Sequence, residues 1–128
     1  MTRILLTIPA LTASALAQNW VNYADETNVR MPVPGNDPSI TVNDTQEKDY
    51  AWGDVDLDGD IDLVCVRKQP FTSTGRDTNI LFMNEGVAEG HAINGVLMDR
   101  TADYVVASDV SGDQGFLTAT NDRDVVLA

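Results

Sequence analysis

Cysteine and histidine are almost absent from this chain, which has one of each in 128 residues. A single cysteine excludes an intrachain disulfide framework, and one cysteine with one histidine cannot supply the ligands of a zinc site. The only base that could activate Cys65 is His91, which stands in a glycine-rich turn. We therefore assign no catalytic residue, do not expect an enzyme, and expect Cys65 to be a small buried residue within a strand.

Basic residues are also scarce. Eight lysines and arginines stand against 20 aspartates and glutamates, so the net charge is -12 and the isoelectric point lies near 4.1. Nucleic acid and anionic membrane surfaces are poor partners for such a chain, whereas cations are natural ones. Aromatic residues make up only 6% of the sequence, which favours one β-rich, turn-rich domain over a large aromatic core.

No hydrophobic run is long enough to cross a bilayer of about 30 Å. Residues 1–17 combine a short positive start, an apolar run over 4–11, and the small-x-small pattern Ala15-Leu16-Ala17. This pattern is typical of a secretory signal peptide and predicts a secreted protein, extracellular or periplasmic. The alternatives are a first core strand or a membrane anchor, but the run is short and rich in Thr, Ser and Pro.

What the chain has in abundance is aspartate, concentrated in residues 53–64. Alternating carboxylates around one glycine repel each other strongly unless a hard cation lies among them, and Ca2+ prefers several oxygen ligands. We predict a Ca2+ loop in which Asp60 ligates through its backbone carbonyl at position 7 and Gly59 makes the turn at position 6. The predicted side-chain ligands, at positions 1, 3, 5 and 9, are Asp54, Asp56, Asp58 and Asp62.

Two other interpretations of the aspartates fit the sequence less well. An EF-hand or dockerin-type loop opens with the same pattern but needs a bidentate Glu at position 12, where this chain has Cys65. The exit over 61–66 alternates and is β-branched, so it predicts a strand rather than a helix. A merely solvated acidic turn does not explain the glycine at position 6 or the strand that follows directly.

The loop resembles the calcium loop of FG-GAP and VCBS repeats, the units of integrin-alpha-like β-propellers. The family's Asn-x-Leu-Phe/Tyr-x-Asn-x-Gly signature is present over 79–86. Its next element, an aromatic followed by Asp-x-Thr, appears over 96–101 with Leu or Met in place of the aromatic. The resemblance covers 49–101 and implies an all-β, antiparallel propeller blade with the calcium loop between two of its strands.

Within this blade the patterns predict strands over 50–54, 62–66, 80–83 and 96–100. A polar connection is expected over 67–78 and a glycine-rich turn over 85–95. The positions expected to pack in the core, including a tryptophan, are Trp52, Leu63, Val64, Ile80 and Phe82.

A faint internal repeat relates Asp25-Glu26-Thr27 to Asp99-Arg100-Thr101, with a period of about 75 residues. We therefore expect an incomplete repeat array, in which 18–48 is a proline-broken strap ending a preceding repeat. Residues 102–128 are expected to be a second strap and the first strand of a truncated next repeat. Residues 109–115 resemble a degenerate second loop, which we interpret as a turn and not a metal site.

Together these features predict a secreted Ca2+-binding repeat protein with a structural or adhesive role, touching extracellular protein or carbohydrate. The alternative is a non-catalytic accessory propeller of a secreted hydrolase or lyase. A third possibility is that the chain is a fragment, whose remaining blades come from a longer protein or from self-association.

Overall fold

The structure is a computed structural model, and it describes residues 23–33, 35–37 and 44–127. The predicted signal peptide over 1–17 lies outside the described residues. So does part of the strap predicted over 18–48.

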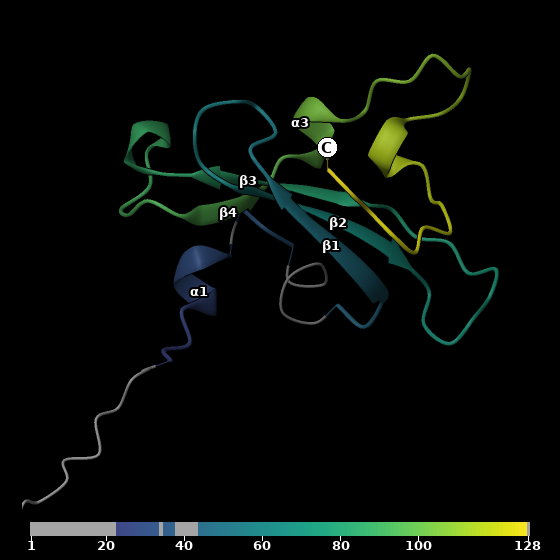
Figure 1. Ribbon diagram of the computed structural model, residues 1–128, viewed down its shortest axis with the longest axis horizontal. Helices are drawn as coiled ribbons and strands as arrows, with labels where there is room; N and C mark the ends of the chain where they lie inside the picture. Colours follow the sequence, from purple (N-terminus) through teal and green to yellow (C-terminus); the bar gives the residue numbers. More distant parts are fainter. Residues whose placement is uncertain (1–22, 34, 38–43, 128) are drawn as a thin grey trace, which may run out of the picture.

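The centre of the fold is one four-stranded sheet in which every neighbouring pair of strands is antiparallel (Figure 1). The strands follow the order of the chain: β1 (Glu47–Gly53), β2 (Asp62–Lys68), β3 (Ile80–Glu85) and β4 (Val96–Asp99). All four predicted strands are present, and the all-β prediction is confirmed at this level. The sheet is open, with β1 and β4 at its edges, and the described residues form no propeller.

Within the described ranges, helical structure is limited to single turns. These are α1 (Thr27–Arg30), η1 (Val87–Glu89), α3 (Thr101–Tyr104) and η2 (Gly115–Leu117). Among the residues placed by the structure, no helix has the length and apolar character needed to cross a bilayer.

One side of the sheet, here called the Cys65 face, is set by the register of β1 to β3. Tyr50 pairs with Cys65 and Cys65 with Ile80, so these side chains project to the same side. The buried cluster on this face is Leu63, Cys65, Ile80 and Phe82, with Met31 and Leu97 packed against it. Three of the predicted core positions are confirmed here.

Trp52 was predicted to lie in the core, and this prediction is wrong, because its exposed fraction is 61%. It faces the same side as its partner Leu63, but β1 is an edge strand. Met31 packs against the central cluster and not over β1. The two aromatic side chains that β1 places on this face, Tyr50 and Trp52, therefore stay exposed.

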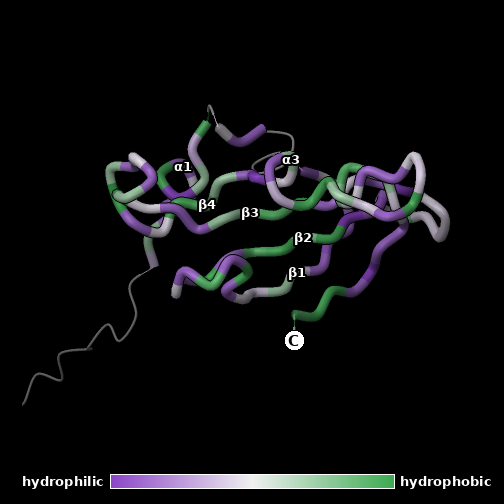
Figure 2. The backbone as a smooth tube through the Cα atoms, turned by 90° about the horizontal axis from the view of Figure 1, so that it is seen from above, coloured by the Kyte–Doolittle hydropathy of each residue, from purple (hydrophilic) through white to green (hydrophobic). Residues whose placement is uncertain are grey.

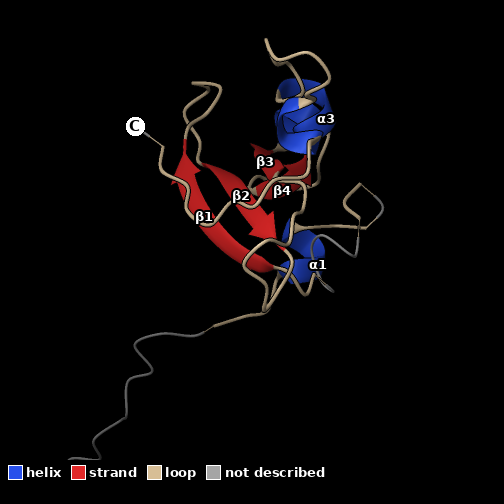
Figure 3. Ribbon diagram, turned by 90° about the vertical axis from the view of Figure 1, so that its right-hand side faces the viewer, coloured by secondary structure: helices blue, strands red, loops and turns tan. Residues whose placement is uncertain are grey.

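The other side, here called the Val64 face, is covered by the chain that follows β4. Val64, Leu81 and Met83 form its buried cluster. Three residues from distant parts of the C-terminal segment pack on it: Val105, Phe116 and Val125. Figure 3 shows α3 and the following loops gathered beside one side of the curved sheet, and Figure 2 shows hydrophobic stretches along β2 and β3.

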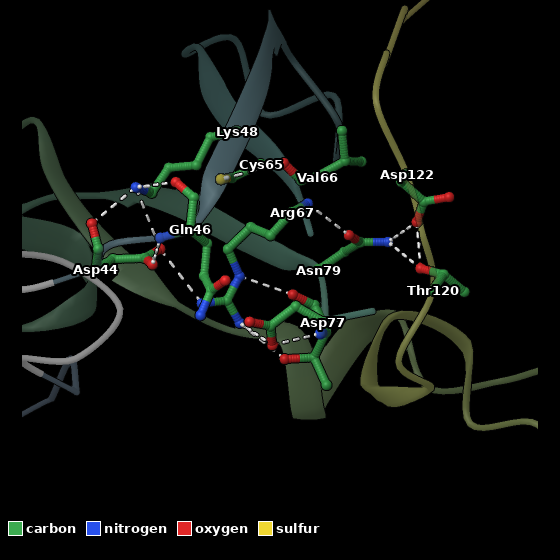
Figure 4. Close-up of polar contacts among 11 residues, drawn as sticks. Asp44, Gln46, Lys48, Cys65, Val66, Arg67, Asp77, Asn79, Thr120 and Asp122 are labelled. Carbon is green, nitrogen blue, oxygen red and sulfur yellow. Dashed lines mark hydrogen bonds and ion pairs between the residues drawn. The ribbon is translucent and has the colours of Figure 1, made fainter. Parts of the chain in front are cut away.

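Polar contacts fasten the C-terminal segment to the connection between β2 and β3 (Figure 4). Asp77 and Thr120 form an isolated antiparallel bridge, with N–H···O distances of 2.9 and 2.8 Å. Asn79 accepts a hydrogen bond from the Arg67 backbone at 2.9 Å and donates one to Asp122 at 2.5 Å. Residues 121–127 then run beside β1 without a strand assignment, although 124–128 were expected to begin a strand.

Candidate metal centre

The acidic loop is the connection between β1 and β2. Its neck is closed by the last pair of the ladder, Gly53 with Asp62. Gly59 has a φ of 103°, a conformation that favours glycine, and this confirms the turn predicted at position 6. Leu57 also adopts a left-handed conformation, with a φ of 64°, although it carries a branched side chain.

Three of the five predicted ligands are brought together by this backbone. Asp54, Asp56 and Asp58 each offer a carboxylate oxygen, and these three oxygens lie within 4.8 Å of one another. Backbone N–H groups inside the loop hold the same carboxylates: Gly59 donates to Asp54 at 3.1 Å, and Asp60 donates to Asp58 at 3.0 Å. The cluster could hold a metal ion.

The fit to a cation can be tested on the oxygens that the protein itself leaves unpaired. Among the described residues, the buried Oδ1 atoms of Asp54 and Asp60 have no hydrogen-bond partner. An unpaired buried acceptor costs free energy, and a carboxylate oxygen in this position is a natural ligand for a hard cation. The residues present therefore fit a divalent cation with oxygen ligands.

Asp62 has a different position from the other four. Its exposed fraction is 1%, and both of its oxygens accept backbone hydrogen bonds. Oδ2 accepts from Val55 at 2.8 Å and Oδ1 accepts from Asn84 at 2.9 Å. The structure thus places Asp62 as a link between the loop and β3, outside the group of three clustered side chains. The side chain of Asp60 is not part of that group either, and its predicted ligation through the backbone carbonyl stays a prediction.

Asn84 is a residue that the sequence analysis did not connect with the loop. Its side-chain amide donates to the Ile61 carbonyl at 3.0 Å, next to the backbone contact with Asp62. The available signal was its place in the 79–86 motif, which was used for the resemblance and not for the loop.

The electrostatics of the loop disfavour its fully ionised form. Desolvation raises the pKa of Asp56, and the negative charges of Asp58, Asp62 and Asp54 raise it further. The pKa of Asp60 is raised in the same way, by desolvation first and then by the neighbouring carboxylates. A bound cation relieves this repulsion, because it supplies the positive charge that the loop lacks.

The other candidate residues lie elsewhere. The 109–115 segment is a turn with Gly112 at a φ of 84°, and its aspartates belong to no metal-ligand group among the described residues. Cys65 is 1% exposed, and burial raises the pKa of its thiol to about 11. His91 contacts Glu85 at 2.7 Å, and Glu85 is also paired with Arg100.

The chain was compared with protein-family models, with curated proteins and with solved structures, and no match was found in any of the three.

Proposed function

We propose that this protein binds Ca2+ in the loop over 54–62 and that the ion has a structural role. The observation that carries the proposal is the buried, unpaired Oδ1 of Asp54 within a cluster of three carboxylates. The three clustered side chains offer carboxylate oxygens as ligands, which suits a hard cation. Ca2+ accepts flexible geometry with many carboxylate and carbonyl ligands, whereas Mg2+ demands a near-ideal octahedron and keeps several waters.

The proposed role of the ion follows from the connections of the loop. The ion neutralises the clustered carboxylates and so fixes the backbone between β1 and β2. Asp62 joins the same loop to β3 through Asn84, so order in the loop extends to a third strand. Extracellular modules bind Ca2+ with dissociation constants of about 10^-4 to 10^-3 M, and at 1 mM Ca2+ this adds about 0.4–1.4 kcal/mol of stability.

We further propose that the sheet is a blade of the FG-GAP/VCBS type in a secreted protein that touches extracellular protein or carbohydrate. A four-stranded antiparallel meander with an acidic loop between its first two strands supports this proposal. Such a blade makes its partner contacts through surfaces that a single sheet leaves exposed.

The test is a thermal melt of the full chain in millimolar Ca2+ and in chelator, with calorimetric titration of Ca2+ alongside. We expect Ca2+ to raise the melting temperature by about 2–8 °C. The variant Asp56→Ala should lose most of this shift, because it removes one clustered ligand. The matched control is Asp109→Ala, an exposed aspartate of the 109–115 turn, which should keep the full shift.

A wild-type melt that does not respond to Ca2+, together with no heat of binding, would contradict the proposal. An equal loss of the shift in both variants would contradict the assignment of the site.

A further inference from the structure

Asn94 and Gly95 form the only Asn-Gly pair in the sequence, and they end the loop between β3 and β4. The backbone nitrogen of a residue that follows asparagine can attack the side-chain amide carbon. Glycine hinders this attack least, because it has no Cβ and the widest choice of backbone conformations. Asn94 is exposed, so water reaches its amide. The contacts of the pair decide whether the fold promotes this reaction or blocks it.

The peptide group that joins Asn94 to Gly95 is bound by a cation. Arg30, in the helix α1 that lies beside β4 (Figure 1), donates from Nη1 to the Asn94 carbonyl at 2.5 Å and to the Gly95 carbonyl at 3.3 Å. The Gly95 N–H has no hydrogen-bond acceptor among the described residues. A guanidinium at the Asn94 carbonyl stabilises the negative charge that this oxygen takes up when the neighbouring N–H loses its proton. Arg30 therefore favours the nucleophilic form of the Gly95 nitrogen.

The side-chain amide of Asn94 is held as an electrophile. Its Oδ1 accepts a hydrogen bond from the Val87 N–H at 2.9 Å. The amide also packs on Gly86, where an added Cβ would lie 3.1 Å from Cγ. A backbone donor at Oδ1 stabilises the negative charge that develops there when a nucleophile adds to Cγ. The leaving nitrogen, Nδ2, donates to no acceptor within the described part of the chain.

The other described asparagines lack this combination of contacts. In four of them Nδ2 donates to an acceptor at 2.5–3.3 Å, and the next residue is larger than glycine: Asn36, Asn79, Asn84 and Asn121. The fifth, Asn28, precedes Val29, whose N–H donates to the Glu26 carbonyl at 2.9 Å and is not free to react.

We propose that Asn94 and Gly95 form a self-modifying site, at which Arg30 and the Val87 N–H promote conversion of Asn94 through a cyclic imide to aspartate and isoaspartate. The Gly95 nitrogen gives its proton to water and forms a bond to Cγ. The bond between Cγ and Nδ2 breaks, and Nδ2 takes a proton from water and leaves as ammonia. Water then opens the imide. Cleavage between the nitrogen and Cγ gives aspartate, and cleavage between the nitrogen and the main-chain carbonyl carbon gives isoaspartate.

Both products alter the start of β4. Each adds a negative charge to a chain whose net charge is already -12. Isoaspartate also lengthens the main chain by one carbon and turns the carbonyl that Arg30 binds into a free carboxylate. The proposal goes beyond the ion site and does not require the ion.

The test follows Asn94 by mass spectrometry while the full chain is kept in mildly alkaline buffer with chelator. Trypsin releases residues 77–100 as one peptide, in which Asn79 and Asn84 are internal references. We expect Asn94 to convert before either reference, and about tenfold faster in the folded chain than in the chain unfolded by guanidinium chloride. This factor is smaller than the about 10²–10³-fold effect of a donor in an enclosed oxyanion hole, because the site is exposed. A folded chain that converts Asn94 no faster than the unfolded chain would overturn the proposal.

Two variants test the named donors. Arg30→Gln removes the cation and should slow the folded chain to about the rate of the unfolded chain. The matched control is Glu26→Gln, which removes the carboxylate that Arg30 binds at 2.8 Å but keeps the cation, and it should keep the wild-type rate. Val87→Pro removes the N–H at the first position of η1, where proline is tolerated, and should also slow the reaction.

Thermal melts establish that each variant is folded before its rate is compared. Folded Arg30→Gln and Val87→Pro chains that both convert at the wild-type rate would overturn the proposal, since the sequence pair alone would then account for the reaction.

Discussion

At Asp62 a single buried carboxylate holds backbone N–H groups from two different parts of the chain. Asp62→Ala leaves the N–H groups of Val55 and Asn84 without their acceptor, and each such loss costs about 1–3 kcal/mol. We expect a destabilisation of about 2–4 kcal/mol, measured as the shift of the urea midpoint in chelator, so that loss of an ion does not contribute.

The control for this measurement is Asp58→Ala, which truncates an exposed aspartate of the same loop. In chelator it should change stability by no more than about 0.5 kcal/mol. Equal costs for Asp58→Ala and Asp62→Ala would show that the buried link to β3 does not stabilise the fold.

At the residue scale, spacing along the chain predicted part of the site. The turn at Gly59 and the grouping of Asp54, Asp56 and Asp58 follow from positions within one short loop. The role of Asp62 could not be predicted in this way, because its partner Asn84 is 22 residues distant and meets it only when β2 and β3 lie in one sheet.

At the scale of elements, the outer edge of β4 is covered by a side chain. Asn36 is 3% exposed, donates to the Leu97 carbonyl at 2.8 Å and accepts from the Asp99 N–H at 2.6 Å. It thus makes two of the hydrogen bonds that a further strand would make. Open strand edges promote association between chains, so this contact protects the sheet as well as stabilising it.

The variant Asn36→Ala removes both hydrogen bonds from the edge of β4. We expect a loss of about 1–3 kcal/mol in unfolding free energy and increased light scattering on heating. The control is Asn121→Ala, since the hydrogen bond that Asn121 donates is an exposed one, to the Ser73 carbonyl, which lies in a loop. Unchanged stability and scattering in Asn36→Ala would contradict this role.

The strands were the most predictable elements, because apolar alternation and the acidic loop mark their positions. Their ends were less so: β1 begins at Glu47, three residues before the range expected from the sequence. The helices α1 and α3 have four residues each, too few to produce a periodic pattern.

At the scale of the whole molecule, the C-terminal segment supplies the side chains that pack against the buried cluster on the Val64 face. Val125 packs against the cluster on the Val64 face, whereas its neighbour Val126 is 84% exposed. We expect Val125→Ala to lower the unfolding free energy by about 1 kcal/mol and Val126→Ala to leave it unchanged. Urea unfolding of the two variants makes the comparison, and equal midpoints would show that the segment does not pack on the sheet in solution.

The repeat seen in the sequence predicted a strand over 124–128, whereas the structure assigns no strand over 124–127, and the repeat did not predict what this segment packs against. Which face of a sheet is covered, and by what, depends on contacts between distant segments. Here the bridge between Asp77 and Thr120 and the packing of Phe116 bring the segment onto the Val64 face.

The burial of Cys65, the only cysteine, prevents disulfide formation between folded chains. Cys65 lies at the centre of the sheet, 1% exposed, with a pKa of about 11 for its thiol. Two folded copies cannot bring these sulfur atoms together, and the protonated thiol is a poor nucleophile. A disulfide between the Cys65 residues of two chains therefore requires that both sheets open first. The fraction of disulfide-linked chains thus measures how often the protein has unfolded under oxidising conditions.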